Sequence, residues 1–111
     1  MKKIIAASIG NCVHVAGIMN FLTLAEREGY ATRFLGAAIS IDELLHVVKD
    51  EKPDYVGVSY RLTPEPLMKV LAELKKKMSL FGLKDIKWVF GGTEPTAKVA
   101  EESDIFSIVF N

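Results

Sequence analysis

Short apolar runs alternate with amphipathic segments along almost the whole chain, and this alternation constrains the fold more than any other feature. Five runs are rich in β-branched and aromatic residues and have the length of strands: residues 3–9, 31–35, 55–59, 86–90 and 105–110. Each run is nearly continuous in apolarity, which is typical of parallel strands covered on both faces. The regular order of strand and helix predicts a parallel sheet with right-handed crossovers.

The segments between these runs carry apolar residues at helical spacing. The run Ser40-Ile41-Asp42-Glu43 has the spacing of a capping box, and Thr63 followed by Pro64 suits the start of a helix. Gly82 follows the third segment and is a typical helix stop. We therefore expect four helices, over roughly residues 15–29, 41–52, 64–81 and 95–102.

Composition limits the classes of function that are open to this chain. Its 111 residues suit one compact domain over residues 1–111, and 14 basic residues balance 14 acidic ones. Zero net charge argues against a nucleic-acid partner, because a phosphate backbone attracts a basic surface. The single cysteine, Cys12, excludes an internal disulfide and fits a reducing compartment. No stretch is long and apolar enough to span a bilayer, so we expect a cytoplasmic protein without a membrane partner.

The chain stops at Asn111, directly after the fifth apolar run. A doubly wound domain normally adds a closing helix at this point, and here the final helix is missing. Without that helix, part of one sheet face is expected to stay apolar and exposed. We expect another domain or subunit, or a second copy in a homo-oligomer, to cover this face, unless the chain is part of a longer protein.

The loops that follow the first four strands contain the candidate binding residues. In open α/β sheets, ligands bind outside the carboxyl ends of the strands, where the strand order reverses. We expect the loops at residues 10–17, 36–40, 59–63 and 91–96 to gather there. A neutral imidazole can coordinate a metal, and paired glycines let a flat ligand approach the backbone. The resulting candidates are His14, Ser59, Thr63, Gly91 and Gly92, although Thr63 alone suits a helix cap better and His14 could cap the first helix or bond a neighbouring backbone group.

The order of these residues resembles the cobalamin-binding domain family of methionine synthase, glutamate mutase and methylmalonyl-CoA mutase. That family carries Asp-x-His-x-x-Gly after the first strand, where this chain has Cys12-Val13-His14-Val15-Ala16-Gly17. A serine ends the family's third strand, with a threonine four residues on in methionine synthase, and the run Val56-Gly57-Val58-Ser59-Tyr60-Arg61-Leu62-Thr63 matches both. The Gly-Gly after the fourth strand is matched by Gly91-Gly92. The resemblance covers essentially the whole chain and implies a flavodoxin-like (Rossmann-like) doubly wound sheet of five parallel strands in the order 2-1-3-4-5.

The resemblance also implies a cofactor, cobalamin, and a role for each matching residue. His14 would be the lower axial ligand of cobalt and would displace the dimethylbenzimidazole of the cofactor. The displaced nucleotide tail would then enter a slot beside the sheet. Gly17 would make room for the tail, Ser59 and Thr63 would contact the tail or the corrin, and Gly91-Gly92 would line the path of the tail.

The chain departs from the family pattern at Cys12, which stands at the position of the aspartate. A ligating imidazole needs a partner on its second nitrogen, and a thiol is a poorer acceptor than a carboxylate. Asn11 or a water molecule could take the place of that aspartate. The missing final helix is a second departure, because in the family it forms one wall of the slot. Tyr60 and Arg61 could face the corrin or a partner domain, or could form a rim without a chemical role.

Two functions follow from the resemblance. The first is a corrinoid-carrying module, incomplete as an enzyme, whose partner domain or subunit supplies the substrate site of a methyltransferase or a radical mutase. Methylcobalamin is favoured over adenosylcobalamin, because Thr63 matches methionine synthase. The alternative is a non-catalytic binding or sensing domain that has lost or changed its ligand. A receiver domain needs an acidic cluster and a phosphorylatable aspartate where Asn11 and Ser59 stand, and no set of residues suits a hydrolase.

Overall fold

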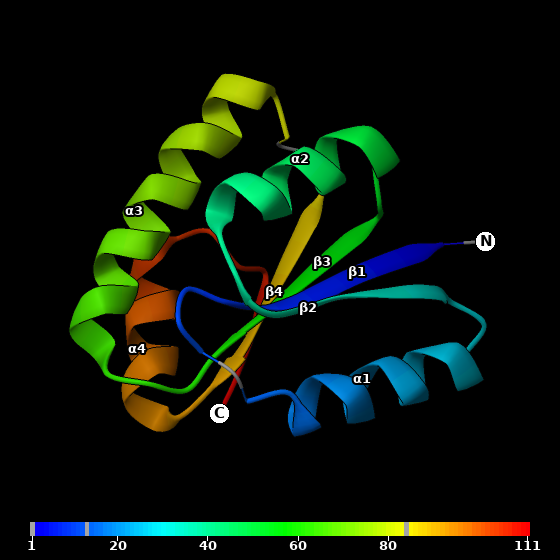
Figure 1. The fold of residues 1–111 in the computed structure, drawn as a ribbon, viewed down its shortest axis with the longest axis horizontal. Helices are drawn as coiled ribbons and strands as arrows, with labels where there is room; N and C mark the ends of the chain where they lie inside the picture. Colours follow the sequence, from blue (N-terminus) through cyan, green and yellow to red (C-terminus); the bar gives the residue numbers. More distant parts are fainter. Residues whose placement is uncertain (1, 13, 84) are drawn as a thin grey trace.

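The computed structural model describes residues 2–12, 14–83 and 85–111, so Val13 of the histidine motif lies outside the described residues. Its five strands form one parallel sheet in the order β2-β1-β3-β4-β5 (Figure 1). This is the predicted flavodoxin-like order. Along the chain the elements are β1 Lys3–Ile9, α1 Ala16–Arg27, β2 Ala31–Ile39, α2 Ile41–Glu51, β3 Tyr55–Tyr60, α3 Pro64–Phe81, β4 Lys87–Gly92, α4 Glu94–Ser103 and β5 Ile108–Phe110.

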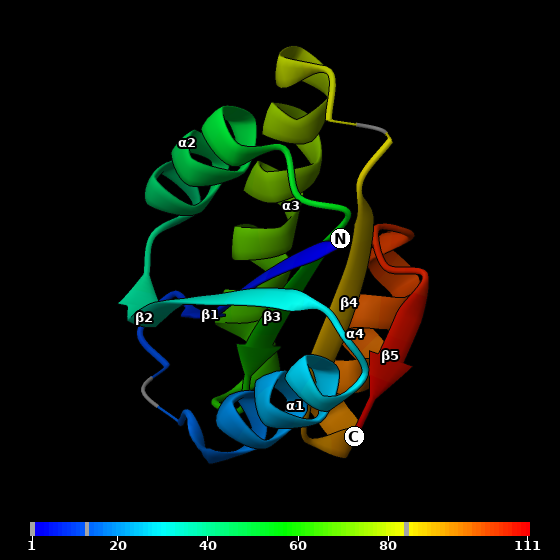
Figure 2. The same cartoon turned by 90° about the vertical axis from the view of Figure 1, so that its right-hand side faces the viewer.

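The helices cover the two faces of the sheet unequally. Helices α2, α3 and α4 lie on one face, and α1 alone lies on the other (Figures 1 and 2). Side chains on successive residues of a strand point to opposite faces, and β1 follows this rule. Ala7 and Ile9 belong to the larger core under α2–α4, whereas Ile4 and Ala6 pack with Ile18 and Leu22 of α1. The larger core also contains Trp88 and Phe90 of β4, together with Leu44, Leu67, Leu71 and Leu74.

Part of the sheet face on which α1 lies remains uncovered, as the sequence predicts. Helix α1 packs with Ile4, Ala6, Phe34 and Tyr55, and so lies mainly over β1, β2 and the start of β3. Beyond it, the β5 side chains of Ile108 and Phe110 are 46% and 52% exposed. The open strip of sheet next to α1 leads directly into the candidate site.

Four strands end or begin at other residues than predicted, and β3 differs only by ending one residue later, at Tyr60. Strand β2 continues to Ile39, so most of the expected loop at residues 36–40 is strand. Irregular pairing with β1 and positive φ angles at Gly36 and Ala38 let β2 stay hydrogen-bonded to this point. Strand β4 extends through Gly92, which places both glycines in the strand instead of the loop. Strand β5 begins only at Ile108, and Ser107 before it donates two hydrogen bonds to the carbonyl oxygen of Trp88.

The helix starts agree with the sequence signals in different degrees. Ser40 caps α2, and its hydroxyl accepts a hydrogen bond from the Glu43 amide at 3.1 Å. Thr63 is the N-cap residue of α3, but its side chain makes no capping hydrogen bond. The short α4 has a reciprocal capping box between Thr93 and Thr96. Across the described ranges, no helix is both long and apolar enough to cross a membrane.

Candidate functional site

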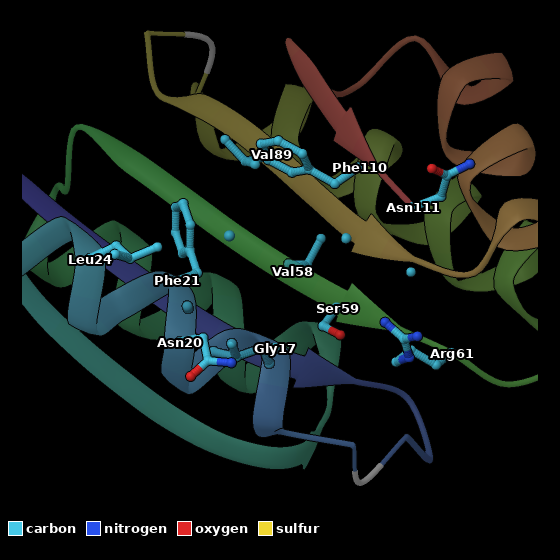
Figure 3. Close-up of a pocket in the computed structure, with 15 residues that line it drawn as sticks. Gly17, Asn20, Phe21, Leu24, Val58, Ser59, Arg61, Val89, Phe110 and Asn111 are labelled. Atoms are coloured by element: carbon cyan, nitrogen blue, oxygen red, sulfur yellow. The ribbon is translucent and has the colours of Figure 1, made fainter.

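A groove of about 430 Å³ opens between α1 and the carboxyl halves of β3, β4 and β5. Figure 3 shows α1 along one side of the groove, with Val89 and Phe110 on the opposite side and Ser59 and Arg61 toward one end. Most lining side chains are apolar, and the lining residues are Ala6, Gly17, Ile18, Asn20, Phe21, Leu24, Gly57, Val58, Ser59, Arg61, Val89, Gly91, Gly92, Phe110 and Asn111.

The groove owes its depth to glycines in the sheet. Strand register pairs Gly57 with Val89, and Gly91 with both Ser59 and Phe110, so these residues share the face under α1. A Cβ atom at Gly57 would contact Ala6 and Phe21 at 3.6 Å, and one at Gly91 would meet nothing within 4 Å. A side chain at either position would therefore extend into the groove. The arrangement leaves room for a flat, largely apolar group to lie against the backbone.

The two neighbouring glycines, Gly91 and Gly92, lack a side chain for different structural reasons. A Cβ atom at Gly92 would collide with the Thr96 hydroxyl and the carbonyl oxygen of Tyr60 on the opposite face. The Thr96 hydroxyl lies 3.1 Å from that carbonyl oxygen and accepts a hydrogen bond from the Thr93 amide at 2.9 Å. The backbone of Gly92 lines the groove, but internal packing explains why it has no side chain. Only Gly91 opens space toward the groove.

Gly17 and Ser59 lie at the groove, whereas His14 and Thr63 do not line it. Gly17 is in the first turn of α1, and a Cβ atom there would meet nothing within 4 Å. Ser59 is 9% exposed, at the carboxyl half of β3. Thr63 is exposed two residues beyond Arg61, at the start of α3. The structure therefore brings Gly17, Ser59 and the two glycines of β4 together and leaves Thr63 outside.

His14 lies on the exposed loop between β1 and α1, at the carboxyl edge of the sheet. Its Nδ1 atom is 3.6 Å from the Sγ atom of Cys12. Asn11 is exposed and makes no side-chain hydrogen bond to His14 within the described part of the chain. The partner next to the His14 ring is therefore Cys12. The sequence had suggested Asn11 or a water molecule for this position.

Cys12 connects the loop after β1 to β2 and to the end of β3. Its side chain is fully buried, and its Sγ atom accepts a hydrogen bond from the Arg61 amide at 3.4 Å. Its carbonyl oxygen accepts hydrogen bonds from the Ser8 hydroxyl at 2.6 Å and from the Ala38 amide at 2.8 Å. Burial raises the pKa of the Cys12 thiol, but polar contacts with Ser8, His14 and Arg61 outweigh burial and hold the pKa below its ordinary value.

Tyr60 neither faces a site for the corrin or a partner domain nor forms a rim, the two positions that the sequence suggested. Its side chain is 3% exposed and belongs to the core under α3, on the face opposite the groove. Burial raises the pKa of Tyr60, although contact with Thr63 opposes this effect. Because side chains alternate along β3, Tyr60 and Ser59 cannot face the same side of the sheet.

Sequence reasoning missed the walls of the groove. Phe21 and Leu24 follow Gly17 at helical spacing along α1. This spacing was the available signal. Val89 and Phe110 are apolar residues on β4 and β5, for which the sequence predicts no covering helix on this face. Their place opposite α1 depends on the register of β4 and β5, which no local pattern contains.

Comparisons with known proteins agree with this architecture. The chain matches the family model described as "B12 binding domain" over residues 2–110. A search of the curated proteins found no match. Among solved structures, a cobalamin-binding protein from Desulfitobacterium hafniense DCB-2 is 25% identical with a TM-score of 0.84, and the match covers 97% of this chain and 52% of that one. The methanol:cobalamin methyltransferase complex MtaBC from Methanosarcina barkeri is 19% identical with a TM-score of 0.84, and the match covers 98% of this chain and 41% of that one. The chain therefore spans about half the length of the first structure and less of the second.

Proposed function

The chain belongs to the family of B12-binding domains, and from this membership we propose that it carries cobalamin for a methyltransferase whose substrate site lies in a partner domain or subunit. The observation that carries the proposal is the groove floored by Gly57 and Gly91, which opens at the same sheet edge as the exposed His14. A corrin ring held at His14 would be adjacent to a slot that accepts a flat, apolar group.

His14 is the lower axial ligand of cobalt in this proposal. The contact between its Nδ1 atom and Cys12 supports the role, because a hydrogen bond at Nδ1 leaves the Nε2 lone pair for a metal. Within the residues that the structure describes, no group of three or more histidine, cysteine or acidic side chains could hold a metal ion. His14 would instead be the protein's one ligand to a metal whose equatorial ligands belong to the corrin.

The nucleotide tail of the cofactor occupies the groove. Gly17, Gly57 and Gly91 provide the room, and Phe21 and Phe110 provide apolar walls. Ser59 offers a hydroxyl to the tail, and Thr63, outside the groove, is left for the corrin periphery. Gly92 supports the slot through its fit against Thr96.

The chain's own residues bind, orient and shield the cofactor, and they perform no step of the reaction themselves. When bound, methylcobalamin would supply the methyl group that is transferred. A partner is supported by the MtaBC complex, in which a structural relative is part of a methyltransferase assembly. The threonine four residues after Ser59 favours methyl transfer over radical rearrangement, and the single cysteine supports a cytoplasmic location.

The visible spectrum of hydroxocobalamin mixed with the purified protein tests this function. We expect retained cofactor with a spectrum of histidine-coordinated cobalt, and loss of this spectrum in His14→Ala. His46→Ala is the matched control, because the His46 side chain is 78% exposed on α2, far along the chain from the loop. Absence of cofactor binding, or identical spectra for the wild type and His14→Ala, would contradict the proposal.

A non-catalytic binding or sensing domain that has lost or changed its ligand is the second candidate, and the replacement of the family's aspartate by Cys12 favours it. Such a domain would not hold cobalt through His14. The hydroxocobalamin titration separates the two, because a folded protein that retains no cobalamin would support the binding or sensing domain.

A further inference from the structure

Among the described residues that line the groove, Arg61 has the only charged side chain. It lies beyond the end of β3 and beside Ser59, near the carboxyl edge of the sheet (Figure 3). Its side chain is exposed and makes no ion pair or hydrogen bond to any residue that the structure describes. A single cation at one end of an otherwise uncharged groove suits a ligand with an apolar body and one anionic group.

The peptide group between Tyr60 and Arg61 is held at both of its polar atoms. Its amide donates a hydrogen bond to the Sγ atom of Cys12 at 3.4 Å. The preceding residue, Tyr60, is buried, and its carbonyl oxygen lies 3.1 Å from the Thr96 hydroxyl. The guanidinium therefore extends from an ordered position, which reduces the entropy lost when it binds an anion.

Arg61 also lies next to the loop that carries His14. The Sγ atom of Cys12 contacts both the Nδ1 atom of His14, at 3.6 Å, and the amide of Arg61. In cobalamin, a phosphodiester joins the corrin side chain to the ribose that carries the nucleotide base. If the corrin is at His14 and the base is in the groove, this phosphodiester must pass the end of the groove at which Arg61 lies.

We propose that Arg61 binds the phosphodiester of the cobalamin tail and selects corrinoids that carry a complete nucleotide. The inference rests on the proposed function, and it assigns this residue a task that the shared motif does not include. A guanidinium forms paired, charge-assisted hydrogen bonds with phosphate oxygens, which an amide or a lysine cannot reproduce in the same geometry. Because the side chain is exposed, the gain is moderate and decreases with salt.

The test compares corrinoids that differ in the tail. Affinities for hydroxocobalamin, for cobinamide phosphate and for cobinamide, which lacks phosphate and base, are measured by spectroscopic titration at two salt concentrations. We expect Arg61→Gln to weaken cobalamin binding roughly tenfold and to leave cobinamide binding within about twofold. We expect wild type to bind cobinamide phosphate more tightly than cobinamide, and Arg61→Gln to lose this preference.

Two further variants separate charge from position. Arg61→Lys retains the charge and should restore part of the preference for the phosphate. Arg27→Gln removes the same charge from an exposed position at the end of α1, outside the groove, and should bind every corrinoid as wild type does. Circular dichroism establishes that each variant is folded.

The results distinguish failure of this inference from failure of the proposed function. Equal weakening of cobinamide and cobalamin by Arg61→Gln, or no weakening of either, would overturn the role of Arg61 while cobinamide binding still supports a corrinoid carrier. Absence of binding for every corrinoid would overturn both. Binding of AMP that depends on Arg61, without corrinoid binding, would show that a free nucleotide is the source of the phosphate and would also overturn both.

Discussion

Single residues decide how the sheet edge is organised, and Cys12 has the most connections there. Its sulfur lies between the ring of His14 and the amide of Arg61, and its carbonyl oxygen receives the hydroxyl of Ser8. The loop after β1 is thereby tied to the end of β3. A thiol that accepts a hydrogen bond from the Arg61 amide and contacts the Nδ1 atom of His14 can orient the imidazole, although it is a weaker partner than a carboxylate.

Replacing Cys12 tests this orientation. We expect Cys12→Ala to weaken hydroxocobalamin binding about tenfold, because partners of a metal-binding histidine typically contribute on this scale. Cys12→Ser keeps a polar acceptor of similar size and should retain more of the affinity. Titration of the visible spectrum measures both variants, and ¹⁵N NMR of the His14 ring without cofactor reports whether its tautomer changes. An unchanged tautomer and affinity in Cys12→Ala would count against the role of the sulfur.

Gly91 and Gly92 form a second test at this scale, because their positions are adjacent and their surroundings differ. A side chain at Gly91 enters open space, so Gly91→Val should fold normally and block the groove, reducing cobalamin affinity about tenfold or more while sparing cobinamide. Gly92→Ala should lower the free energy of unfolding by about 2 kcal/mol, since overpacking costs about 1–3 kcal/mol. Urea unfolding and corrinoid titration of both variants check the two expectations. The opposite pattern would mean that the faces are assigned wrongly.

At the level of elements, the carboxyl ends of β1, β3 and β4 and the first turn of α1 form the site together. Helices α2 and α3 begin in different ways, and each start affects the loop before it. Ser40 satisfies the Glu43 amide at the start of α2, whereas Thr63 leaves α3 without a side-chain cap. Pro64 lessens the need at α3, because it has no amide hydrogen to satisfy.

The two helix starts predict different effects of the same kind of substitution. Ser40→Ala should lower the free energy of unfolding by about 1 kcal/mol, the usual contribution of a capping side chain. Thr63→Ala should change it by less than about 0.5 kcal/mol, as expected of an exposed residue without such a bond. Chemical denaturation measures both variants. A larger loss for Thr63→Ala would indicate that the contact of Thr63 with Tyr60 stabilises the fold.

Over the whole molecule, the unequal cover of the sheet creates the groove. Three helices bury one face, and the single helix α1 leaves the strip beside β4 and β5 open (Figure 2). Ile108 and Phe110 remain about half exposed on that strip. A ligand in the groove would contact both α1 and the β4–β5 side of the sheet, and would therefore connect these two parts of the molecule.

Cofactor binding should consequently stabilise the whole domain. At a free ligand concentration of 100 times Kd, binding adds about 2.7 kcal/mol to the free energy of unfolding. For a chain of this size the expected rise in Tm is about 10 °C. Differential scanning calorimetry with hydroxocobalamin measures the rise, and Gly91→Val is the control that should lose most of it. An equal rise in the control would indicate binding outside the groove.

Local pattern was sufficient for the elements and their order, and it was insufficient at the points where strands meet. Strand β1 begins and ends as predicted, and the signals at Ser40 and Gly82 mark real helix boundaries. The extension of β2 through Gly36 and Ala38 was not predicted, because it depends on pairing with β1. The same reason explains why β4 contains the two glycines that had been expected in a loop.

The sequence by itself determined the α/β class, the order of the elements and the collection of His14, Ser59 and the paired glycines at one sheet edge. Periodicity and turn residues are local properties, and parallel crossovers then dictate which loops gather. Only the tertiary structure decided that Gly91 opens the groove, that Tyr60 turns into the core, and that Arg61 lies at the groove while its amide contacts Cys12, 49 residues away in the chain. These outcomes depend on strand register and side-chain alternation between distant segments, since a shift of one residue would exchange the two faces.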